Sequence, residues 1–82
     1  MDRQEILTAL IEIVAGIKEK PIDDFRFVTE QTKIVEDLGL NSIGVLYIVL
    51  GIEDRFGVEM RDLKFENFLT VGSVLDYIEE NA

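Results

Sequence analysis

The sequence predicts an all-α domain, a small irregular four-helix bundle of three main helices and one short helix, with a long loop between the first two main helices. Apolar residues recur at helical spacing in three separate segments, and no segment shows the sustained alternation of a strand. The chain has 82 residues and contains no internal repeat, low-complexity stretch or linker. We therefore expect a single domain over residues 1–82.

The first helix is predicted from about Arg3 to Ile17. Charged residues separate its apolar positions, which makes the segment amphipathic. Its apolar stripe consists of Ile6, Leu10, Ile13, Val14 and Ile17. Pro21 ends the helical pattern, because proline lacks a backbone N–H and biases the preceding residue, Lys20, away from helical angles.

A long connection follows, from about Glu19 to Asn41. Connections of this length without structure are uncommon in compact domains and are often functional. Apolar side chains along the connection should anchor it to the core, namely Ile22, Phe25, Phe27, Val28, Ile34, Val35 and Leu38. We expect Thr32 to cap a single turn from Lys33 to Glu36.

The second helix is predicted from about Ser42 to Phe56, and Gly57 can take the left-handed conformation that closes a helix. The stripe assigned to the core consists of Val45, Ile48, Val49, Ile52 and Phe56. A short turn is predicted from Lys64 to Phe68, and Thr70 should cap the final helix. The apolar face of that helix consists of Val71, Val74, Leu75 and Ile78.

The composition is strongly acidic, with 8 basic and 17 acidic residues and a net charge of −9. This charge repels phosphate backbones and anionic lipid surfaces, so it argues against nucleic-acid and membrane binding and favours partners with basic patches.

No stretch reaches the roughly 20 apolar residues of a membrane span. The N-terminus lacks the basic start and cleavage site of a secretory signal. The sequence therefore predicts a cytoplasmic location.

Residues for autonomous catalysis are missing from the sequence. The chain has no histidine to act as a general base near pH 7, and it has no cysteine for a nucleophile, a disulfide or a thiolate metal site. The adjacent carboxylates Asp23-Asp24 and Glu36-Asp37 are interpreted as solvated charges in the connection. A calcium-binding loop starting at Asp37 is excluded, because its third and twelfth positions need oxygen ligands and are Gly39 and Ile48. We expect neither an enzyme nor a metal site.

One hydroxyl lies where the long connection becomes the second helix. Asn41 is a suitable N-cap, because its side-chain oxygen can accept a hydrogen bond from a first-turn N–H. Ser42 would then be the first helical residue, where the helix dipole favours a negative charge such as a phosphate group. On residue type alone, Ser42 is better explained as a serine that simply begins a helix.

The segment Asp37-Leu38-Gly39-Leu40-Asn41-Ser42-Ile43 resembles the prosthetic-group attachment motif of acyl carrier proteins, which is usually Asp-Ser-Leu after an Asp-Leu-Gly turn. The similarity extends over nearly the whole chain in order, spacing and length. Thr32–Asp37 resembles the turn before the motif in this family. Glu53–Met60 resembles the end of its second helix, and Phe68–Glu79 resembles its last helix.

The resemblance implies that a phosphopantetheinyl transferase attaches 4′-phosphopantetheine covalently to the Ser42 oxygen. The thiol of that arm would hold acyl groups as thioesters and deliver them to partner enzymes of fatty acid, polyketide or related biosynthesis. The resemblance also implies a monomer, with Asn41, Ile43, Leu40 and Leu38 around the arm and an apolar interior that shelters the acyl chain. Two alternatives remain, an aminoacyl or peptidyl carrier of the same fold and a helical adaptor without a prosthetic group.

Two positions depart from the family pattern, Asn41 in place of aspartate and Ile43 in place of leucine. The outward face of the second helix is predicted to carry Ile43, Gly44, Tyr47, Leu50, Gly51 and Asp54, and it is more apolar than in many relatives. The predicted partner-docking residues are Asp37, Tyr47, Leu50, Gly51, Glu53, Asp54 and Met60. The alternative is that the two glycines have no role and that Tyr47 lies across a neighbouring core residue.

Overall fold

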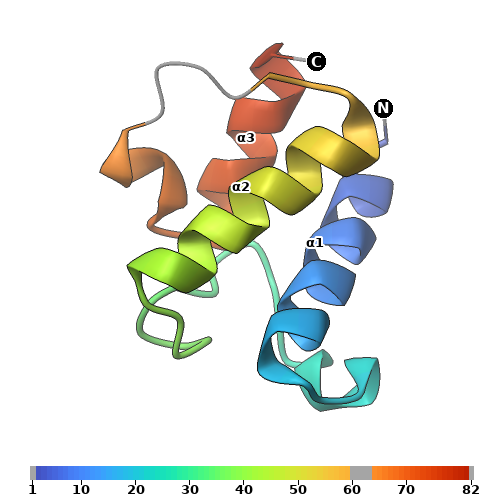
Figure 1. The fold of residues 1–82 in the computed structure, drawn as a ribbon, viewed down its shortest axis with the longest axis vertical. Helices are drawn as coiled ribbons and strands as arrows, with labels where there is room; N and C mark the ends of the chain where they lie inside the picture. Colours follow the sequence, from blue (N-terminus) through green and yellow to red (C-terminus); the bar gives the residue numbers. More distant parts are fainter. Residues whose placement is uncertain (1, 60–63, 82) are drawn as a thin grey trace.

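The computed structural model describes residues 2–59 and 64–81, and it shows the predicted all-α fold (Figure 1). The elements are α1 (Arg3–Lys18), a 3₁₀ turn η1 (Ile22–Phe25), α2 (Ser42–Phe56), a second 3₁₀ turn η2 (Phe65–Phe68) and α3 (Val71–Asn81). The described ranges contain no strand, and their one β-bridge joins Lys33 to Thr70. The sequence placed all of residues 22–25 in a loop, so η1 is an addition to the prediction.

Local signals at the helix ends explain the bounds of α1 and α2. The Asp2 carboxylate accepts a hydrogen bond from the Gln4 N–H at 3.1 Å and begins α1. Glu19 follows α1 in the left-handed conformation, with φ 56°, and ends the helix. Pro21, two residues later, prevents the helix from continuing. Gly57 closes α2 with φ 65°, as predicted. The prediction of α1 rested on apolar spacing and Pro21 and did not include the caps Asp2 and Glu19, whereas the closing residue of α2 was predicted.

The core lies between the three helices, and α1 packs against both α2 and α3. The predicted stripes of α1 and α3 are confirmed, although Ile13 and Ile17 are only partly buried. In α2 the side chains of Ile48, Val49 and Ile52 are buried, while Val45 and Phe56 are partly buried against them. The largest fully buried side chains are Ile6, Leu10, Val14, Ile34, Ile48, Ile52, Val71, Val74, Leu75 and Ile78.

The connection between α1 and α2 is anchored by fewer apolar residues than predicted. Phe25, Ile34 and Leu38 are buried, and Val28 is partly buried. The prediction was wrong for three residues, which are largely exposed, namely Ile22 (52%), Phe27 (56%) and Val35 (42%). Phe27 lies outside the buried ring of Phe25, with the ring centroids 6.3 Å apart. Apolar composition alone cannot tell which residues of an irregular segment point inward.

The turn that precedes α2 is closed by Asp37, whereas Thr32 was predicted to cap it. The Asp37 carboxylate accepts a hydrogen bond from the Lys33 N–H at 2.9 Å, and the Lys33 carbonyl accepts bonds from the N–H groups of Asp37 and Leu38. The Thr32 hydroxyl instead accepts a bond from the Thr29 N–H at 2.8 Å. Asp37 therefore has a structural role in shaping the path to α2.

Backbone hydrogen bonds attach this connection to the start of α3. The Ile34 N–H donates to the Leu69 carbonyl at 3.2 Å, and the Val71 N–H donates to the Thr32 carbonyl at 2.9 Å. The Thr70 hydroxyl accepts a bond from the Ser73 N–H at 3.1 Å, which confirms Thr70 as the predicted cap of α3. The loop before α2 is thus held against α3 as well as against the core.

Candidate functional site

Ser42 is exposed and is the first residue of α2. The Asn41 side chain accepts a hydrogen bond from the Gly44 N–H at 3.0 Å, which confirms Asn41 as the cap. The N–H groups of Ser42 and Ile43 lie in the first turn, where a helix offers no acceptor of its own. These N–H groups and the helix dipole favour a negative group on the Ser42 side chain.

Two buried leucines hold the loop that presents Ser42. Leu38 and Leu40 have only 4% and 5% of their surface exposed, and Gly39 between them has φ 66°. Glycine suits this position because left-handed angles are unfavourable for other residues. The burial of Leu38 confirms its predicted role as an anchor of the connection, and Leu40 is an anchor that was not predicted. The prediction that both leucines flank an arm on Ser42 stays a prediction. Ile43 is 63% exposed beside Ser42.

The two glycines of α2 do not lie on its outward face, so that part of the prediction was wrong. Gly44 is buried, and a Cβ at this position would lie 3.0 Å from the Leu40 side chain. Gly51 faces α1, and a Cβ there would lie 3.0 Å from Cδ1 of Ile13. Each glycine therefore permits a close approach within the domain.

Four exposed apolar residues form a continuous stripe on α2. Ile43, Leu46, Tyr47 and Leu50 are exposed by 63%, 55%, 56% and 51%. They follow the i, i+3, i+4, i+7 spacing of one helix face. The sequence prediction missed Leu46, although this spacing from Ile43 could have identified it. The exposure of Tyr47 argues against the alternative in which it covers a core residue.

The predicted docking charges lie in different surroundings. Asp54 is exposed and Glu53 is partly exposed, whereas the exposed Asp37 carboxylate is engaged in the turn before α2. Arg55 donates two hydrogen bonds of 3.1 Å to the carboxylate of Glu12 on α1. Met60 lies outside the described residues. Residues 42–52, which carry the apolar stripe, include no charged side chain.

A hollow of about 230 Å³ lies between the end of α1 and the start of α2. Asn41 and Ile43, the neighbours of Ser42, both line it. Its wall includes Tyr47 and Lys18, whose ammonium donates a hydrogen bond to the Gly39 carbonyl at 3.1 Å. The sequence did not predict this hollow, because its walls come from segments far apart along the chain.

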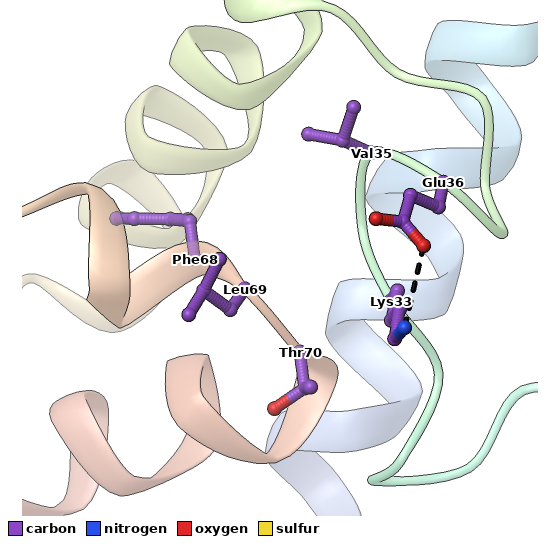
Figure 2. A pocket seen from close by; sticks show the side chains of 6 residues that line it. All are labelled: Lys33, Val35, Glu36, Phe68, Leu69 and Thr70. Atoms are coloured by element: carbon purple, nitrogen blue, oxygen red, sulfur yellow. Dashed lines mark hydrogen bonds and ion pairs between the residues drawn. The ribbon is translucent and has the colours of Figure 1, made fainter.

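A larger pocket of about 450 Å³ lies between the turn before α2 and the segment that leads into α3. Figure 2 shows Lys33, Val35 and Glu36 on one side and Phe68, Leu69 and Thr70 on the other. Phe68 is buried, whereas Val35 and Leu69 are 42% and 49% exposed. An ion pair of 3.3 Å joins the Lys33 ammonium to the Glu36 carboxylate at this pocket. The pocket is therefore apolar with a charged side.

Other functional groups are scarce in the part of the chain that the structure describes. Its acidic residues form no group of three or more that could hold a metal ion. No helix in the described ranges has the length and apolar character needed to cross a membrane. The exposed hydroxyl of Ser42 thus remains the candidate site.

Comparison with known proteins finds similarity along most of the chain. The family model described as "Phosphopantetheine attachment site" matches residues 6–78. The acyl carrier protein of Helicobacter pylori (strain G27) is 39% identical over 70 residues, which cover 85% of this chain and 90% of that protein. The acyl carrier protein of Thermotoga maritima is 36% identical over 78 residues, which cover 95% of this chain and 93% of that protein.

Proposed function

The chain belongs to the acyl carrier protein family, whose covalently attached group is 4′-phosphopantetheine, and we propose that Ser42 carries this group. The exposure of Ser42 at the start of α2 is the observation that supports this assignment. The chain has only one other serine, Ser73. The Ser73 hydroxyl is partly buried and lies 2.9 Å from the Thr70 hydroxyl.

The surroundings of Ser42 fit a phosphodiester. The hydroxyl is accessible to a transferase, the first turn of α2 favours a negative charge, and a hollow beside Asn41 leaves room for the arm. Asn41 caps the helix without adding a negative charge next to the phosphate. The chain has no histidine, so the transferase must supply the base that activates the serine.

The bound group would supply a flexible arm with a terminal thiol, on which acyl groups travel as thioesters. We propose that the 450 Å³ pocket shelters the acyl chain. Its support is the apolar surface offered by Val35, Phe68 and Leu69. Within the proposed function, the chain carries cargo and leaves catalysis to its partners.

The exposed stripe of Ile43, Leu46, Tyr47 and Leu50 is the proposed docking surface for those partner enzymes. An exposed apolar patch of this kind is typical of an interaction site, and this one adjoins the residue that would bear the cargo. Asp54 lies on the same helix and offers a negative charge to a basic patch on a partner. The proposed partners are the transferase and enzymes that load or modify acyl groups in fatty acid, polyketide or related biosynthesis.

Intact-protein mass spectrometry tests the attachment site. After incubation with coenzyme A and a broad-specificity phosphopantetheinyl transferase, the protein should gain the mass of one phosphopantetheine. Ser42→Ala should abolish the gain, and the matched control Ser73→Ala should retain it. A wild-type protein that gains no mass would favour the adaptor alternative, and a Ser42→Ala protein that still gains mass would overturn the assignment of Ser42.

The same measurement on protein isolated from cells identifies the cargo. A loaded acyl group would support the proposed function. A loaded amino acid or peptide would instead indicate the aminoacyl or peptidyl carrier of the same fold.

A further inference from the structure

We propose that the Lys18 ammonium forms an ion pair with the phosphodiester attached to Ser42. This inference rests on the proposed function, because it concerns the group that Ser42 would carry. Lys18 is the last residue of α1, and the C-terminal end of α1 and the N-terminal end of α2 lie at the same end of the molecule (Figure 1). The fold thus brings a cation near the attachment site from a segment that the sequence motif does not include.

The position of the ammonium supports this pairing. Its Nζ donates a hydrogen bond to the carbonyl of Gly39, three residues before Ser42. Lys18 also lines the 230 Å³ hollow between α1 and α2, together with Asn41 and Ile43. The Lys18 side chain therefore shares this hollow with the two residues that flank the proposed phosphate carrier.

The charge of Lys18 is better placed to bind a phosphate than those of most other described cations. Ion pairs with carboxylates already engage the side chains of Arg3, Arg26, Lys33 and Arg55. Lys18 instead contacts a neutral carbonyl, and an ammonium has three N–H donors. In a chain with a net charge of −9, a further negative group is most stable beside such a cation.

Carboxylates on the other side of Lys18 are the competitors for its charge. Asp24, Glu36 and Asp37 line a neighbouring hollow that Lys18 also borders. Two of these carboxylates are already engaged by Lys33. The Asp37 carboxylate accepts a hydrogen bond from the Lys33 N–H, and the Glu36 carboxylate accepts one from the Lys33 ammonium. Lys20 lines this second hollow and not the 230 Å³ hollow between α1 and α2, so it provides a matched control.

The test is a thermodynamic cycle that combines the modification with a substitution. Thermal unfolding midpoints are measured for apo and holo forms of the wild type, Lys18→Gln, Lys18→Arg and Lys20→Gln at low salt. Loss of the Gly39 hydrogen bond affects apo and holo forms alike, so the difference between holo and apo midpoints isolates the contribution of the phosphodiester.

For the wild type, Lys18→Arg and Lys20→Gln, we expect the same difference between the holo and apo midpoints. For Lys18→Gln, the midpoint of the holo form minus that of the apo form should be about 1–5 °C smaller than in the wild type. This loss is the size expected for an exposed ion pair in a domain of this size. Raising the salt concentration to about 0.5 M should remove this loss. Equal differences for Lys18→Gln and Lys20→Gln would overturn the pairing.

Nuclear magnetic resonance of the wild type provides a second measurement that needs no variant. The Cε methylene resonance of Lys18 should shift between apo and holo forms, and that of Lys20 should stay in place. Equal shifts of both lysines, or of neither, would contradict the proposal. Failure of the modification itself is seen separately, because the wild type would then gain no mass.

Discussion

The guanidinium of Arg3 donates two hydrogen bonds to the carboxylate of Glu30, from Nε to Oε2 at 3.0 Å and from Nη2 to Oε1 at 2.6 Å. The same guanidinium lies 2.9 Å from carboxylate oxygens of Asp76 and Glu79 on α3. Arg3 thus links the start of α1, the connection and α3. The hydrogen bond from Arg3 holds the pKa of Glu30 below its ordinary value.

This lowered pKa predicts a dependence of stability on pH. A carboxylate whose pKa is lowered by folding stabilises the protein fully above its unfolded pKa, about 4.3 for glutamate, and loses that contribution as the pH falls through the folded value. The thermal midpoint should therefore fall on acidification below about pH 5. Glu30→Gln should lower the midpoint at pH 7 and reduce this dependence.

The exposed pair of Arg26 and Asp23 provides the control for that measurement. Both side chains are about 80% exposed, at 81% and 78%, so Asp23→Asn should leave the pH profile nearly unchanged. A Glu30→Gln protein with the acid dependence of the wild type would contradict the role assigned to this ion pair.

The parts of the fold that follow local rules were predictable from sequence. The bounds of α2 follow from Asn41 and Gly57, which cap the helix through their own side chain and backbone. The exposed position of Ser42 follows from the same cap. The surroundings of Gly51 were not predictable, because they depend on the distance between α1 and α2, which sequence spacing does not give.

The irregular connection was the least predictable segment for a related reason. In regular helices the spacing of apolar residues shows which side is buried. No such period applies across the turn at Ile34 and Val35, where one side chain is buried and the next is 42% exposed. The 450 Å³ pocket and the 230 Å³ hollow could not be predicted from sequence either, because their walls come from segments distant in sequence.

Substitution of the helical glycines should show that Gly51 is needed for packing. Gly51→Ala would place a Cβ 3.0–3.3 Å from three atoms of Ile13, and we expect it to lower the free energy of unfolding by about 1 kcal/mol despite the better helix propensity of alanine. Apart from the backbone of its own helix and its chain neighbours, Gly16 in α1 has open space within 4 Å of the corresponding position. Gly16→Ala should therefore raise the free energy of unfolding by about 0.5–1 kcal/mol.

Urea unfolding measures both changes, and a double variant identifies their cause. Ile13→Val removes the Cδ1 atom nearest to the new methyl group. The cost of Gly51→Ala should therefore be smaller in the Ile13→Val background. If Gly51→Ala stabilised the protein as much as Gly16→Ala, the close contact between α1 and α2 would be unimportant.

The left-handed glycine before the attachment site should affect both stability and modification. Gly39→Ala forces alanine to adopt φ 66° and should lower the free energy of unfolding by about 1–2 kcal/mol. Gly57→Ala imposes the same strain at φ 65° after the far end of α2, so its stability cost should be similar.

The two glycine variants should differ in their reaction with the transferase. Gly39→Ala redirects the loop that presents Ser42 and should slow phosphopantetheinylation, whereas Gly57→Ala should react at the wild-type rate. The two variants are compared by their initial rates of mass gain, measured at a temperature where both are folded. Equal rates would show that the position of Gly39 does not determine how Ser42 is presented.

The apolar stripe on α2 should contribute to partner binding without contributing to folding. Tyr47→Ala and Leu46→Ala remove exposed side chains, so their unfolding midpoints should stay close to that of the wild type. We expect each to lower kcat/KM of a cognate acyl-transferring enzyme by about tenfold, mainly through KM, because a buried interface anchor contributes more than 1 kcal/mol.

Salt dependence and a distant control distinguish this docking from charge attraction. Residues 42–52 include no charged side chain, so the effect of Tyr47→Ala should be the same at about 0.05 and 0.5 M salt. Ile22→Ala removes a side chain that is 52% exposed in the connection, and its kcat/KM should equal that of the wild type. Wild-type transfer rates for both Tyr47→Ala and Leu46→Ala would exclude the stripe as the docking surface, because the partner would then have to engage another face of the domain.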